Sequence, residues 1–211
     1  MLCCTLRLYF KRFCANYFLM LKFHLLRILF RLLIICILST FSQFGFSSNA
    51  FAQNTKIDNL FMKLQDIENK NHQDIEKEIW SEWRKSGSPK SDLLLKRGMD
   101  AMSKGDYNAS IEHLTAAIDY TPEFAEAWNM RATVFFLMDN YNQSVSDIQQ
   151  TLKLNPRHFG ALSGLGMIFE RSGQPKQALE VYKKLLEVHP RSINAIMSVD
   201  RLIKYLEGTS L

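Results

Sequence analysis

Four of the five histidines, those beyond residue 52, are the side chains of this chain best suited to metal binding or proton transfer. No two of His72, His113, His158 and His189 stand four positions apart, the spacing that places two imidazoles on one face of a helix. All four cysteines lie within the first 36 residues, so no cysteine lies near these histidines in the sequence. We therefore expect no metal site and no cofactor, with the histidines serving as surface or core residues.

Two short motifs around Ser163 resemble catalytic or cofactor sites only in part. Ser163-Gly164 would need glycine at positions 161 and 165 to form a nucleophile elbow, and the chain has Ala161 and Leu165 there. Gly164-Leu165-Gly166 lacks the third glycine of a dinucleotide loop and has no strand before it. Both motifs are better explained by close contact between helices, and we expect no enzymatic activity.

The elements that carry these residues are set by a repeat. Pro122, Pro156 and Pro190 stand 34 residues apart, and each is expected to end a helix. Gly105, Asp139 and Gly173 share the period and mark a turn between two helices, where a left-handed or tight conformation is expected. Two further columns, one small and one large, share the same period: Gly98, Ala132 and Gly166; Leu94, Trp128 and Leu162.

This pattern resembles the tetratricopeptide repeat, with units at 91–124, 125–158 and 159–192. The resemblance implies an all-α, right-handed solenoid of stacked helical hairpins. Arg97 and Arg131 replace the usual leucine that Leu165 keeps, and Ser110 and Ser144 replace the usual alanine. We expect these replacements to weaken individual contacts without disturbing the period.

The segments on either side of the repeats are also expected to be helical. Residues 53–90 carry apolar residues at helical spacing, and predict a hairpin that is either a degenerate repeat or an N-terminal cap. Residues 193–211 have an apolar stripe from Ile193 to Leu206 and predict an amphipathic capping helix.

The first 52 residues predict a secretory signal peptide. They hold six basic residues and no acidic ones, a short apolar core at 32–38, and an Ala50-Phe51-Ala52 cleavage motif. Met20 is an alternative start, since it leaves a signal of more usual length. Without cleavage the segment would instead anchor the protein in the inner membrane.

Charge and cysteine content agree with an exported protein. The chain has 26 basic and 21 acidic residues, and removing the six basic residues of 1–52 leaves 20 against 21. The basic character therefore belongs to the leader and does not indicate nucleic-acid binding. The part after residue 52 has no cysteine, so it needs no disulfide in an oxidising periplasm. The layout resembles short signal-bearing tetratricopeptide proteins of alphaproteobacteria.

The family resemblance implies a binding groove lined by the first helix of each repeat. The groove would be mostly neutral and rich in methionine, which suits adaptable apolar contacts. It lacks the lysines and arginines of the family's chaperone-binding branch. Whether the groove is open or covered by 57–84 stays undecided at this level. The expected groove residues are Leu95, Met99, Met102, Asn129, Thr133, Phe136, Ser163, Met167 and Glu170.

Two functions follow from the sequence. The first is a non-catalytic adaptor of the bacterial cell envelope that binds a peptide segment of another envelope protein in this groove, with no metal or nucleic acid involved. The alternative is a structural protein that forms a weak homo-oligomer through its terminal faces, because the stripe from Ile193 to Leu206 is apolar.

Overall fold

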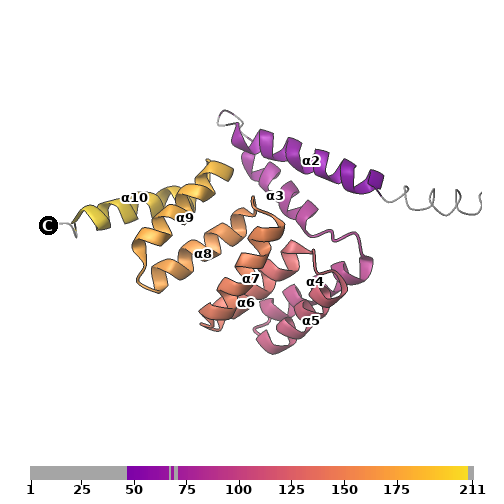
Figure 1. Ribbon diagram of the computed structural model, residues 1–211. Coiled ribbons are helices and arrows are strands. Elements are labelled where there is room, and N and C mark those ends of the chain that lie inside the picture. The colour runs from indigo at the N-terminus through magenta and orange to yellow at the C-terminus, as the bar shows by residue number, and fades with distance from the viewer. Residues whose placement is uncertain (1–46, 67, 69–70, 209–211) are drawn as a thin grey trace, which may run out of the picture. The chain divides into compact units, whose positions relative to one another are not determined.

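A computed structural model describes residues 47–66, 68 and 71–208, and every regular element in these ranges is a helix (Figure 1). Residues from Lys56 onward form one compact unit. The expected all-α solenoid of stacked hairpins is confirmed. The helices are α2 (Ser47–Gln65), α3 (His72–Trp83), α4 (Pro89–Ser103), α5 (Tyr107–Tyr120), α6 (Ala125–Leu137), α7 (Tyr141–Leu154), α8 (Phe159–Arg171), α9 (Pro175–Val188) and α10 (Ile193–Gly208).

The expected leader lies mainly outside the described residues, which begin at position 47. The expected cleavage point after Ala52 falls within α2. Among the helices that the structure describes, none is long and apolar enough to cross a membrane.

Small residues let the two helices of each repeat approach closely. A Cβ atom built on Gly98 would lie 2.6 Å from Leu114 of α5, and one on Gly166 would lie 2.6 Å from the Tyr182 ring of α9. The turn between the two helices also forms as expected, because Gly105, Asp139 and Gly173 all have positive φ.

The two serines that replace alanine each form a hydrogen bond that the sequence prediction of a weakened contact did not include. The Ser110 hydroxyl donates a 2.7 Å hydrogen bond to the Gly98 carbonyl, and the Ser144 hydroxyl donates a 2.8 Å bond to the Ala132 carbonyl. Both serines are fully buried. Each hydroxyl therefore ties the second helix of its repeat to the first, which alanine at the same place could not do.

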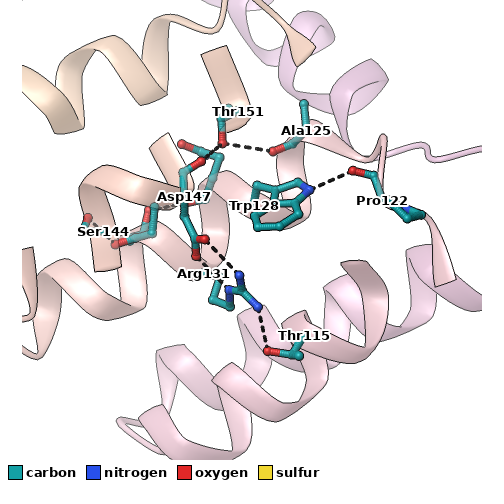
Figure 2. A network of polar contacts seen from close by, with 11 residues as sticks. Thr115, Pro122, Ala125, Trp128, Arg131, Ser144, Asp147 and Thr151 are labelled. Carbon is teal, nitrogen blue, oxygen red and sulfur yellow. Dashed lines mark hydrogen bonds and ion pairs between the residues drawn. The ribbon is translucent and has the colours of Figure 1, made fainter. Parts of the chain in front are cut away.

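Arg131 corrects the prediction of a weakened contact in the second repeat (Figure 2). Its Nε and Nη2 atoms donate to the two carboxylate oxygens of Asp147 on α7, at 2.7 and 2.9 Å. Its Nη1 atom donates to Thr115 Oγ1 on α5 at 2.9 Å. One side chain of α6 therefore connects the second helices of two successive repeats, where a leucine would offer only apolar contact.

The hairpin of α2 and α3 packs beside the third repeat. Its residues Leu64 and Ile79 belong to the same buried core as Phe159 and Leu162 of α8. Asp58 also forms an ion pair with Arg157, just before α8, at 2.5 Å. The sequence left open whether 53–90 imitates a repeat or caps the stack, and these contacts place it along the edge where α8 begins.

The stack of repeats begins at α4. On α6, α8 and α10, two positions that face the preceding repeat are buried. One is alanine in each helix and the other is a larger apolar residue: Ala127, Ala161 and Ala195; Val134, Ile168 and Leu202. The corresponding positions of α4 are Leu93, which is 49% exposed, and Asp100, which is also exposed. This face of α4 is therefore exposed as at the end of a stack, since no helical pair among the described residues covers it.

Candidate peptide-binding groove

The first helices of the three repeats lie next to one another, because α4 contacts α6 and α6 contacts α8. Residues at equivalent positions on these helices therefore form rows across the stack. Seven of the nine expected groove residues reach the surface at least in part: Met99, Met102, Thr133, Phe136, Ser163, Met167 and Glu170.

The other two expected groove residues are interior. Leu95 is 2% exposed and belongs to the core between the first two repeats. Asn129 is 4% exposed, and its amide donates to the carboxylate of Glu126 at 3.1 Å. Leu95 and Asn129 occupy the same position in the first helices of two successive repeats. This position faces neighbouring elements, so neither side chain offers surface to a ligand.

The central part of the groove is apolar and partly open. Phe136 lies between two neighbours, with its ring centre 5.8 Å from that of Tyr141 and 4.5 Å from the guanidinium carbon of Arg171. Met167, in the next repeat, is 41% exposed. Phe136 and Met167 therefore offer partly accessible apolar surface on two successive first helices.

A charged cluster closes the far end of this apolar part. Arg201 of α10 forms a 2.6 Å ion pair with Glu170 of α8. This bond, aided by a hydrogen bond from Tyr182, holds the pKa of Glu170 below its ordinary value despite burial. Burial and the Glu170 carboxylate in turn raise the pKa of Tyr182, so its hydroxyl stays protonated and donates. The sequence analysis treated α10 as a cap and missed that it adds Arg201 to this surface.

Aromatic residues of α3 form a wall at the other end of α8. The Trp83 ring stacks on His158 with centres 4.2 Å apart, and Trp80 meets Phe159 edge-on at 5.1 Å. A Cβ atom at Gly160 would lie 2.5 Å from Trp80, so only glycine permits this approach. The hairpin therefore covers the start of α8, whereas Met167 stays accessible farther along the helix.

A buried polar pair lies beneath this wall. His158 accepts a hydrogen bond at Nδ1 from the Ala161 backbone N–H, so its Nε2 is free to donate to Glu126 at 3.0 Å. Both side chains are fully buried. We expected the histidines to be surface or core residues, and these contacts place His158 in the core. The part of the chain that the structure describes holds no cluster of three or more His, Cys, Asp or Glu that could bind a metal ion.

Comparison with known proteins agrees with this architecture. A family model described as "Tetratricopeptide repeat" matches residues 95–138 and 138–193. A "TPR repeat-containing protein" of Rhizobium etli is 36% identical over 154 residues, which cover 72% of this chain and 76% of that protein. The chain belongs to the tetratricopeptide-repeat family.

More distant tetratricopeptide proteins match a smaller share of the chain. The small glutamine-rich tetratricopeptide repeat-containing protein 2 of Saccharomyces cerevisiae is 32% identical over 53% of this chain and 32% of its own length. The solved structure of the first TPR of Spaghetti (RPAP3) bound to HSP90 peptide SRMEEVD has a TM-score of 0.55 and 22% identity. That match covers 57% of this chain and 98% of the other, and at this identity it shows the fold alone.

Proposed function

We propose that this tetratricopeptide protein is a non-catalytic adaptor that binds an apolar or amphipathic peptide segment of another protein of the bacterial cell envelope. The row of accessible apolar side chains on adjacent first helices carries the proposal, with Phe136 and Met167 at its centre. Peptide binding by a structural relative, the first TPR of Spaghetti (RPAP3) with an HSP90 peptide, supports this mode of recognition as an analogy.

The proposed setting is the periplasm, after cleavage following Ala52. It rests on the basic, acid-free first 52 residues and on the absence of cysteine after them. Detection of the chain in a periplasmic fraction, with Gln53 at its N-terminus, would support this setting. Recovery of the uncleaved chain in the inner-membrane fraction would replace it with a membrane-anchored adaptor.

The groove is tested by reversing the polarity at Phe136. The immobilised protein is incubated with envelope extract, the retained proteins are identified, and synthetic segments of each are then titrated by calorimetry. Phe136→Glu places a carboxylate against apolar ligand surface, so retention and peptide binding are expected to disappear. Leu93→Glu is the matched control, because Leu93 is 49% exposed and lies outside the groove. Equal binding by Phe136→Glu and the wild type would refute the groove.

A second function, self-association through α10, is favoured by one observation. In each repeat the first helix packs against a second helix. The corresponding face of α10 carries Ile196 and Ile203, which are 47% and 38% exposed. Sedimentation of the wild type and of Ile203→Glu tests this alternative, and a wild type that stays monomeric at high concentration would exclude it.

A further inference from the structure

The side of α4 that ends the stack of repeats is basic. Figure 1 shows α4 and α5 at the end of the repeats opposite to α10. Residues at steps of three and four positions share one side of a helix, and such steps connect the exposed residues of this side of α4. We call them the α4 face: Lys90, Leu93, Lys96, Arg97, Asp100 and Lys104.

The corresponding positions of the later repeats are apolar and buried. Lys90 corresponds to Phe124, which is buried. Asp100 corresponds to Val134 and Ile168, which are both buried against the preceding repeat. The charges of the α4 face therefore belong to its place at the end of the stack, where no helical pair among the described residues covers them.

The cations of the α4 face are not neutralised by other side chains. In the described ranges, Lys96, Arg97 and Lys104 form no ion pair. The Lys90 ammonium lies over the Tyr120 ring, 3.5 Å from its centre. Asp100 is the one acidic residue of the face, so the face has an excess of three positive charges. The chain after residue 52 is nearly neutral as a whole, with 20 basic and 21 acidic residues.

This excess of one sign distinguishes the α4 face from a surface that serves solubility alone. A solubilising surface intersperses both signs of charge. Four cations spread over 14 residues of one helix instead create a positive potential along about 21 Å, which attracts an extended negative surface.

The chemistry of the α4 face fits a membrane better than a folded protein. Specific protein interfaces have an apolar core that is poor in charged residues, and this face has no such core. Its exposed apolar groups are single residues next to cations, since Leu93 is 49% and Tyr120 is 57% exposed. Cations with scattered apolar and aromatic side chains suit the headgroup region of an anionic bilayer, where phosphates pair with the cations.

We propose that the α4 face binds the surface of an anionic phospholipid membrane and holds the protein there as a peripheral protein. The face lies on the end of the stack, whereas Phe136 and Met167 of the groove lie on α6 and α8. The proposal therefore does not rest on peptide binding.

Co-sedimentation with vesicles tests the proposal. The leader is itself basic, so the test uses residues 53–211, which contain the whole compact unit from Lys56 onward. Vesicles of phosphatidylcholine with about 30% phosphatidylglycerol should bind this protein with a dissociation constant on the order of 1 mM lipid. Vesicles of phosphatidylcholine alone should not bind it. Binding should be lost as NaCl is raised from about 50 to about 300 mM, because salt screens the attraction.

Two double variants with the same change in net charge locate the binding surface. Lys96→Glu with Arg97→Glu reverses two charges of the α4 face and should weaken binding about tenfold or more. Lys176→Glu with Lys184→Glu reverses two charges at exposed positions of α9, and should change binding less than about twofold.

Two single variants separate this proposal from that of the groove. Leu93→Glu should weaken vesicle binding, because it adds a carboxylate to the α4 face, and should leave peptide binding unchanged. Phe136→Glu should have the opposite pattern, with normal vesicle binding and no peptide binding. Either proposal can therefore fail while the other holds.

Three results would overturn membrane binding by the α4 face. The first is no binding to either kind of vesicle, or equal binding to both. The second is an equal loss in the two double variants, because total charge and not this face would then govern binding. The third is binding to poly-L-glutamate without binding to vesicles, which would assign the face to an acidic protein segment. Circular dichroism of each variant verifies that the helices remain folded.

Discussion

The ion pair between Arg131 and Asp147 gives the sharpest test of how this solenoid is held together. Arg131 is 16% exposed and Asp147 is 5% exposed, and two parallel hydrogen bonds join them. Replacement of Arg131 by leucine, the usual residue of the family, leaves the Asp147 carboxylate buried without its cation. Loss of one member of a buried pair costs about 3 to 5 kcal/mol, and the partial exposure of Arg131 places the expected loss near 3 kcal/mol.

The expected loss is measured by thermal and urea unfolding of Arg131→Leu. For a chain of this size a loss of about 3 kcal/mol lowers Tm by roughly 6 to 12 °C. Glu180→Ala breaks the exposed pair between Lys183 and Glu180 and should cost less than about 0.5 kcal/mol, which makes it the control.

The third repeat supplies a matched double variant. Leu165 and Val181 occupy there the positions that Arg131 and Asp147 occupy in the second repeat. Arg131→Leu combined with Asp147→Val replaces the buried pair by apolar residues and should return the stability to within about 1 kcal/mol of the wild type, because no buried charge remains unpaired. The reasoning is refuted if either single variant costs less than about 1 kcal/mol, or if the double variant loses the sum of both.

Four further predictions concern the repeats, the hairpin and the acid range. Ser144→Ala removes the hydroxyl that bonds the Ala132 carbonyl and should lower the free energy of unfolding by about 1 kcal/mol in urea titrations; no change would mean that this bond adds nothing. Gly166→Ala brings a Cβ atom to 2.6 Å from the Tyr182 ring and should cost about 1 to 3 kcal/mol, whereas Gly208→Ala meets no atom within 4 Å and serves as its control. Trp83→Ala removes the ring stacked on His158 and should make α2 and α3 susceptible to limited proteolysis before the repeats, and unchanged cleavage would contradict the docking of the hairpin. The ion pair with Arg201 lowers the pKa of the Glu170 carboxyl from 4.5. Its contribution to stability is complete above pH 4.5 and is lost as the pH falls through the lower pKa of the folded state. Glu170→Gln should therefore flatten the loss of stability below pH 4.5, and an unchanged slope would exclude this contribution.

The sequence by itself determined the repeat architecture. The 34-residue spacing of Pro122, Pro156 and Pro190 set the ends of the second helices, and Gly105, Asp139 and Gly173 set the turns. These features are local, because proline ends a helix and a left-handed residue permits a turn whatever the rest of the chain does. Small residues such as Gly98 and Gly166 likewise predicted close contact between helices, since the repeat fixes which helices meet.

Only the tertiary structure decided which side chains meet across long distances in the sequence. The reading of Arg131 as a weakened contact failed because its partners, Thr115 and Asp147, lie 16 residues away on either side and belong to two different helices. The position of the α2 and α3 hairpin was undetermined for the same reason, because its apolar pattern shows that it needs a partner but not which one. Its contact with the third repeat, about 80 residues later, covers the start of α8 and brings His72 and His189 to one cavity. Periodicity encodes the contacts between neighbouring helices, whereas such long-range contacts depend on the shapes and charges of surfaces that exist only after the repeats have stacked.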